Sequence, residues 1–233
     1  MAIREISSYH LGDMLLVFEE ETEFHRVGFY MIPWSMQKDR VLDRKFYRIN
    51  SLAQVKIAGD MYPNCYGNGQ TMRNGESANR MDYKSQKEVA TECGKEIHTY
   101  FEDARGYELE NVITYYHGED SFEMKNIFTN KAEKKVSLEM LSSFEMGDIS
   151  PFLEGIGTDA LLVHRLRSKW SHEGRLVTET VEDLQLEPSW SNWSVGVERF
   201  GQRGSMPVMK YFPFVAVEDS VNHIVWGVQL AHE

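Results

Sequence analysis

The chain has 233 residues, enough for one large β domain or two small ones. Hydrophobic residues make up 42% of it and aromatic residues 12%, so it can fill a core and is not disordered. The formal net charge of −11 argues against a nucleic-acid partner, because binding to a phosphate backbone requires clustered Lys and Arg.

Alternation of apolar and polar residues is the main regular pattern along the chain, and it is typical of strands with one buried face. It begins at Val55 and Ile57, on either side of Lys56. Turn clusters separate the later strand patterns at intervals of roughly ten residues, and no βαβ alternation occurs, which predicts an all-β, antiparallel two-sheet sandwich. The later strand patterns are 121–128, 136–144, 174–188, 212–219 and 225–231.

Residues 158–170 fit two interpretations. Leu162, Leu166 and Trp170 have the spacing of one helix face, whereas Leu162, His164 and Leu166 alternate as in a strand. The pattern alone leaves both open. Further on, the apolar strand 225–231 has no turn or polar tail after it, so we expect the chain to be part of a longer protein.

The stretch "AGDMYPNCYGNGQTMRNGES" (58–77) fits neither a helix nor a strand. It lacks the spacing of a phosphate-binding loop. Its aromatic and polar side chains could bind a sugar, because aromatic rings stack on sugar C–H faces while Asp, Asn and Arg bond hydroxyl groups. In the alternative, which the pattern alone favours, the tyrosines pack inward and Asp60 pairs with Arg73 to fasten a long loop. The candidate side chains are Asp60, Tyr62, Tyr66, Arg73 and Asn74.

Other classes of site have little support. Cys65 and Cys93 form no CxxC motif, which indicates free thiols in a reducing compartment, with a single disulfide as the alternative. The eight histidines form no HExxH motif, so we expect no metal and no cofactor. The chain has neither a signal peptide nor the ~20 consecutive apolar residues of a membrane span, which predicts a cytoplasmic protein without membrane contact.

Five segments, in order, resemble the N-terminal domain of glycoside hydrolase family 36 α-galactosidases. The most specific is "AQVKIAGDMYPNCYGNGQTMRNGES" (53–77), which is similar to the family pattern "VQVK/VGDxYPxGxxxGxTMRNS". The other four are "SYHLGDMLLVF" (8–18), "NVITYYHGEDSFEMKNIFTN" (111–130), "RSKWSHEGRL" (167–176) and "RGSMPVMKYFPFVAV" (203–217).

This resemblance covers essentially the whole chain and implies one β-supersandwich domain, residues 1–233, that precedes a (β/α)8 barrel. Family members hydrolyse terminal α-galactosides, such as melibiose and raffinose, with retention of configuration. Because the barrel holds both catalytic carboxylates, we expect this chain to be inactive alone, with no catalytic residue of its own. A free-standing carbohydrate-binding or subunit-assembly sandwich without chemistry is the alternative.

The resemblance also implies a role for particular residues. The Trp of its Trp-x-x-Glu segment lies at the sugar pocket and corresponds to Trp170, so Asp60, Tyr62, Arg73, Asn74 and Trp170 are the predicted substrate-binding residues. It makes 158–170 a strand. The expected partners are the barrel, an α-galactoside and further copies of the chain, since the family forms tetramers. Residues 27–40 differ from the family's "HLYFGKR", which supplies a contact with a neighbouring subunit, so the resemblance does not assign that contact to this chain. Gly75 replaces the family's Ser.

Overall fold

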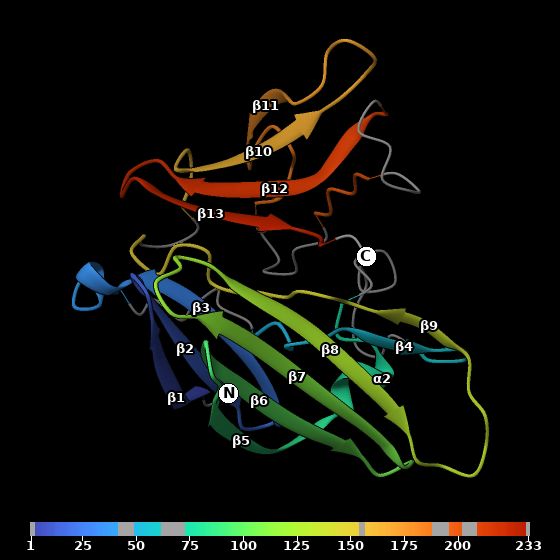
Figure 1. The fold of residues 1–233 in the computed structure, drawn as a ribbon. Coiled ribbons are helices and arrows are strands. Elements are labelled where there is room, and N and C mark those ends of the chain that lie inside the picture. Colours follow the sequence, from blue (N-terminus) through green and yellow to red (C-terminus); the bar gives the residue numbers. More distant parts are fainter. Residues whose placement is uncertain are drawn as a thin grey trace. The chain divides into compact units, whose positions relative to one another are not determined.

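The computed structural model describes residues 3–41, 49–61, 73–153, 157–187, 196–201 and 209–231, and these are nearly all β (Figure 1). The chain divides into two compact units, which are described separately. The first unit comprises residues 1–40 and 47–148, and the second comprises residues 41–46 and 149–233.

The described residues of the first unit form three antiparallel sheets. A three-stranded sheet has the order β1-β2-β3, a four-stranded sheet has the order β5-β6-β7-β8, and β4 pairs with β9. The strands are β1 (Ile3–Leu11), β2 (Met14–Glu21), β3 (Arg26–Pro33), β4 (Val55–Ile57), β5 (Asp82–Ala90), β6 (Gly94–Asp103), β7 (Tyr107–Tyr116), β8 (Phe122–Asn130) and β9 (Leu138–Leu141). A 3-10 turn, η1 (Trp34–Met36), follows β3, and a one-turn helix, α2 (Glu76–Asn79), precedes β5.

Aromatic side chains pack the three-stranded sheet against the four-stranded sheet. Phe29 on β3 is only 1% exposed, and its ring lies 5.6 Å from that of Phe18 on β2. It also contacts the rings of Phe122 on β8, at 6.3 Å, and of Phe144 after β9, at 6.1 Å. The edges of the two sheets are joined by Gln86 on β5, whose Oε1 accepts a hydrogen bond from the Tyr9 hydroxyl (3.1 Å). The first unit is therefore a sandwich with an aromatic core.

Strands β2 and β3 are buried on both faces, and residues 49–54 pack beside β3. The Leu52 amide donates to the Val27 carbonyl (2.9 Å), so this segment runs along the free edge of β3. Gly28 permits the close approach: a Cβ there would lie 2.1 Å from the Asn50 carbonyl oxygen. The segment that leads into β4 is thus held by backbone contact with β3.

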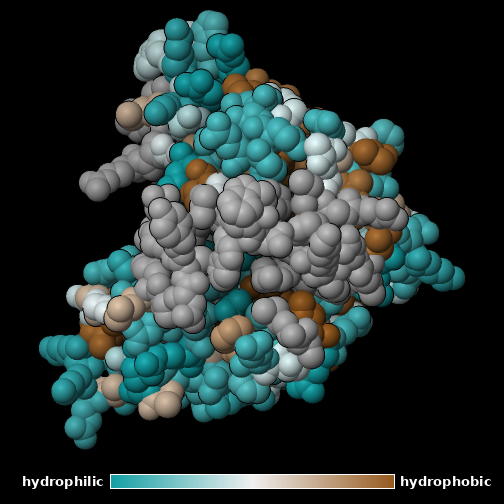
Figure 2. All heavy atoms as spheres, turned by 180° about the vertical axis from the view of Figure 1, so that it is seen from behind, coloured by the Kyte–Doolittle hydropathy of each residue, from teal (hydrophilic) through white to brown (hydrophobic). Residues whose placement is uncertain are grey.

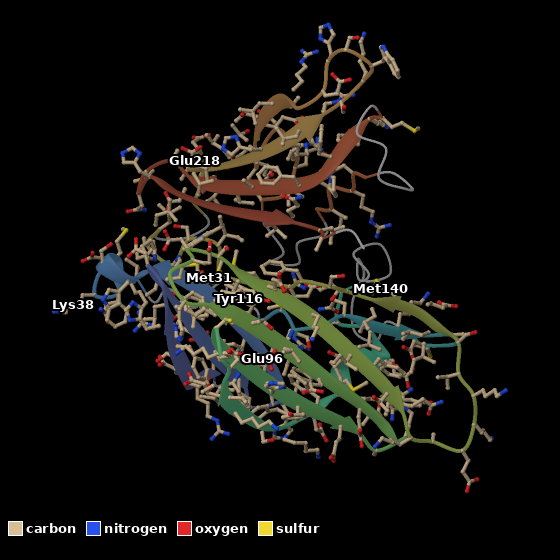
Figure 3. The ribbon with its side chains drawn as sticks, in the orientation of Figure 1. Met31, Lys38, Glu96, Tyr116, Met140 and Glu218 are labelled. Carbon is tan, nitrogen blue, oxygen red and sulfur yellow. The ribbon has the colours of Figure 1, made fainter. Side chains whose placement is uncertain are left out.

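The second unit contains one antiparallel sheet of order β11-β10-β12-β13. Its strands are β10 (Leu161–Arg167), β11 (Arg175–Thr180), β12 (Tyr211–Asp219) and β13 (Ile224–Gln229). Charged side chains join the strands. Arg165 on β10 is 6% exposed and pairs with Glu179 and Glu198. Glu218 on β12, labelled in Figure 3, contacts β10: its Oε2 lies 2.8 Å from His164 Nε2.

The prediction of an all-β, antiparallel fold is confirmed. The prediction of a strand rather than a helix within 158–170 is also confirmed, because β10 forms there. Two predicted strands are shorter than expected. The 136–144 pattern yields only β9, because its partner β4 has three residues. The 174–188 pattern ends at Thr180, where Thr180 and Asp183 exchange side-chain to backbone hydrogen bonds (3.2 and 2.9 Å) and begin a turn.

The described surface is largely hydrophilic. On the face shown in Figure 2, hydrophilic residues dominate the described surface and hydrophobic residues lie in small separate groups. In the described part of the chain, the two helical turns η1 and α2 fall far short of what a membrane-crossing helix needs in length and apolar character.

Phe29→Ala should lower the free energy of unfolding by about 3–5 kcal/mol, because it leaves a cavity between the two sheets of the first unit. Urea denaturation measures the change. Phe24→Ala is the matched control, since Phe24 is 39% exposed and should cost less than about 1 kcal/mol. Equal losses for the two variants would show that Phe29 does not hold the sheets together.

Candidate functional site

The candidate site starts from the β4–β9 pair, which carries the irregular stretch out of the sheet. Figure 3 labels Met140 on β9, which lies opposite Lys56 of β4. Beyond the pair, the Ser142 amide donates to the Gln54 carbonyl (3.0 Å), and Ser142 Oγ accepts from the Gln54 amide (2.8 Å). Asn126 Nδ2 on β8 donates to the Ser142 carbonyl (2.7 Å). The base of the stretch is therefore fixed to the four-stranded sheet.

The stretch leaves and returns through two neighbouring segments, residues 58–61 and 73–79, which we call the neck. The Glu76 amide donates to the Met61 carbonyl (2.9 Å), and the Met61 amide donates to Glu76 Oε2 (3.2 Å). Both sides of the neck are thus joined directly by hydrogen bonds. Tyr62, a predicted sugar-binding residue, lies outside the described residues.

Asp60 lies within the neck, and its side chain is only 4% exposed. Its Oδ2 accepts from the Ile57 amide (2.8 Å), which caps the end of β4. Its Oδ1 lies 3.6 Å from Nη1 of Arg105, at the turn between β6 and β7. The sequence interpretation paired Asp60 with Arg73, whereas the ion pair found here joins it to Arg105. In this arrangement the Asp60 carboxylate fastens the neck.

Asn74 is fixed on the other side of the neck. Its φ of 51° lies in the left-handed region, which Asn tolerates better than most residues. The Asn74 amide donates to Gln54 Oε1 (2.6 Å), and Asn74 Oδ1 accepts from Gln54 Nε2 (3.4 Å). The Asn74 carbonyl accepts from Asn79 Nδ2 (2.7 Å). Gln54 therefore holds both the backbone and the side chain of Asn74.

Glu145, after β9, is a partly buried acid close to Arg73. Burial raises the pKa of Glu145 to about 7, although a hydrogen bond with Ser142 and the positive charge of Arg73 both act to lower it. The sequence analysis did not predict a role for Glu145, because a single buried acid in an irregular segment produces no periodic pattern. With a pKa of about 7 the carboxyl is partly protonated at neutral pH, and its protonated form can both donate and accept a hydrogen bond.

A second charged pair, Glu21 on β2 and Arg26 on β3, contacts the neck through Asn79. Arg26 Nη1 donates to Glu21 Oε2 (3.1 Å), and Arg26 Nη2 donates to Asn79 Oδ1 (2.7 Å). Burial lowers the pKa of Arg26, the charge of Glu21 raises it, and the charge of Arg73 lowers it further. Among the described residues, Glu21 Oε1 and Arg26 Nε are buried without a hydrogen-bond partner. Arg73 thus lies within the electrostatic reach of both Arg26 and Glu145.

The structure brings Asp60, Arg73 and Asn74 to one neck in the first unit. Trp170 belongs to the second unit, in the connection between β10 and β11, and is 78% exposed. The exposed indole of Trp170 offers a flat apolar face within the second unit, and Arg73 brings a guanidinium to the neck within the first. An aromatic face and a guanidinium are each suited to contact with an uncharged polyhydroxyl ligand.

Metal and thiol chemistry find no further support. Within the described ranges, no group of three or more His, Cys, Asp or Glu side chains could hold a metal ion. Cys93 is an exposed free thiol, and Cys65 lies outside the described residues. Comparison of the chain with protein-family models and with curated proteins gives no match.

Glu145→Gln should remove a pH dependence of stability. The native carboxyl keeps its proton up to about pH 7, whereas the unfolded one loses it near 4.5. Between these values the native state binds more protons, so the contribution of Glu145 to stability falls as pH rises. Gln mimics the neutral acid, so the variant should gain relative to the wild type between pH 4.5 and pH 8, by at most about 3 kcal/mol.

Urea denaturation at both pH values measures this gain. Glu139→Gln is the matched control, because Glu139 is 43% exposed and pairs with Lys56 at the surface. That variant should show no comparable gain at pH 8. A constant difference between Glu145→Gln and the wild type at the two pH values would mean that Glu145 ionises normally.

Proposed function

We propose that this chain is the non-catalytic N-terminal domain of a cytoplasmic family 36 α-galactosidase. In that protein it shapes the sugar pocket and subunit contacts beside a catalytic (β/α)8 barrel, which hydrolyses terminal α-galactosides with retention. The observation that carries the proposal is the ordered resemblance of five segments, spread over a chain whose described residues are nearly all β.

The fold supports this proposal through the positions of the resembling segments. Residues 8–18 lie in the β1–β2 hairpin, and residues 111–130 lie in the β7–β8 hairpin, which closes at the Tyr115–Phe122 pair. Residues 167–176 form the connection between β10 and β11. Each is a compact local element that can present side chains to a neighbouring domain.

In the proposed role the neck positions an edge of the pocket. Asp60 and Asn74 fix its two sides, and Arg73 and Tyr62 are offered to the sugar. Trp170 supplies an indole face on which the apolar side of galactose stacks. The partners are the barrel, an α-galactoside and further copies of the chain in a tetramer, without nucleic acid or membrane.

A second function is favoured by one observation. Trp170 is 78% exposed in this chain alone, so a sugar could stack on it without a barrel. A free-standing carbohydrate-binding or subunit-assembly sandwich would use the same residue.

The purified chain should release no p-nitrophenol from p-nitrophenyl α-galactoside, because both catalytic carboxylates belong to the barrel. The protein translated from the complete reading frame should hydrolyse this substrate and leave the β-anomer intact. In that protein Trp170→Ala should raise KM about tenfold, whereas Val221→Ala, which removes an exposed apolar side chain outside the resembling segments, should change it little.

Three results would contradict the proposal. Hydrolysis by the isolated chain would place the catalytic groups within it. A complete protein without α-galactosidase activity would remove the proposed parent. Calorimetric binding of raffinose to the chain, combined with such an inactive complete protein, would favour the free-standing carbohydrate-binding function.

A further inference from the structure

Arg105 occupies the turn between β6 and β7 and is held there by Asp103, the last residue of β6. Arg105 Nε lies 3.1 and 3.0 Å from the two Asp103 carboxylate oxygens, and Nη2 lies 2.6 Å from Oδ2. The Arg105 amide also donates to Asp103 Oδ1 (2.7 Å). The hydrogen bond to Asp103 raises the pKa of Arg105, although partial burial acts in the opposite direction. The guanidinium is therefore charged and has a fixed orientation.

The same guanidinium reaches both sides of the neck. Nη2 donates to Ser77 Oγ (2.8 Å), on the side that returns to the sheet. Nη1 lies 3.6 Å from Asp60 Oδ1, on the side that leaves it. Ser77 is fully buried and the Asp60 side chain nearly so, which weakens the competition of water for these contacts.

Two other bonds join the neck to more distant parts of the unit: Arg26 Nη2 on β3 donates to Asn79 Oδ1 (2.7 Å), and the Ala58 amide donates to the Ser137 carbonyl (2.9 Å). The remaining bonds given above join the neck to itself, to β4 or to the segment before β4. Glu76 and Met61 bond to one another, and Gln54 lies just before β4. Arg105 instead comes from a hairpin of the four-stranded sheet, which is stabilised by pairing along the full length of β6 and β7. It thereby connects the neck to the most regular part of the first unit.

We propose that Arg105 is the positioning residue of the neck: its guanidinium holds the leaving side, at Asp60, against the returning side, at Ser77. The geometry of the neck does not depend on any sugar. The consequence that Arg105 sets the position of Arg73 and Asn74 toward a galactoside rests on the proposed function.

Amide hydrogen exchange of the purified chain, followed by NMR, tests this role. In Arg105→Ala, the amides of Met61, Asn74 and Glu76 should exchange at least about tenfold faster, because the neck opens locally. The amides of Ile97 and Ile113, in the middle of β6 and β7, should stay within about twofold of the wild type.

Two further variants sharpen the test. Arg105→Lys keeps the positive charge but cannot contact Asp60 and Ser77 at once, so its neck amides should exchange at intermediate rates. If Arg105→Ala does not fold, the exchange rates of Arg105→Lys test the proposal. Arg4→Ala is the matched control, since Arg4 also holds a buried carboxylate through Nε and Nη2, that of Glu20 (2.9 and 2.6 Å). It should leave the neck amides unchanged.

Two outcomes would overturn the proposal. Neck amides that exchange as in the wild type would show that Arg105 does not hold the neck. Equal acceleration of neck and strand amides would show that Arg105 only stabilises the fold as a whole. Because no sugar takes part, this result is independent of α-galactosidase activity, and failure of either proposal is distinguishable from failure of the other.

Discussion

The geometry of the candidate site depends on the contacts of the Arg105 guanidinium with Asp60 and Ser77. The chain leaves β4 for a long irregular stretch rich in glycine and must return to α2, and polar side chains join the two sides of its neck. The hydrogen bond from Arg105 to Ser77 (2.8 Å) is charge-assisted, and such bonds contribute about 1.5–3 kcal/mol each, whereas Arg105 and Asp60 form an ion pair at 3.6 Å. Asp60 and Asn74 therefore have a structural role that needs no ligand.

This assignment divides the predicted sugar-binding residues into two groups. Asp60 and Asn74 are bonded to the surrounding protein, so their effect on a ligand would be indirect. Arg73 lies within electrostatic reach of Glu145, whose pKa burial raises to about 7, and Trp170 exposes most of its ring. The proposed function assigns direct contacts with the sugar to Arg73 and Trp170, which belong to different units of the chain.

Part of the fold could be predicted from the sequence, because alternation reports strands with one buried face. It identified β8, where Phe122, Met124 and Phe128 alternate with exposed charges. It could not identify β2 and β3, since both faces of these strands are buried and their pattern does not alternate. The limits of β9 and β11 depended on a short partner strand and on a capped turn.

The site was less predictable than the fold for a physical reason. The residues of the irregular stretch were recognisable from composition and from the family resemblance, but their partners were not. Arg105 reaches Asp60 from another hairpin, and the pKa of Glu145 is raised only because the side chain is buried. Contacts of this kind depend on how the sheets pack, and no local pattern encodes them.

A double-mutant cycle of Asp60→Asn and Ser77→Ala, measured by urea denaturation, tests the central claim most directly. These residues lie on opposite sides of the neck and share Arg105 as a partner, so their effects on the free energy of unfolding should be non-additive by about 0.5 kcal/mol or more. The coupling should vanish when Arg105 is replaced by Ala. Additive effects, or a coupling that persists without Arg105, would contradict the account.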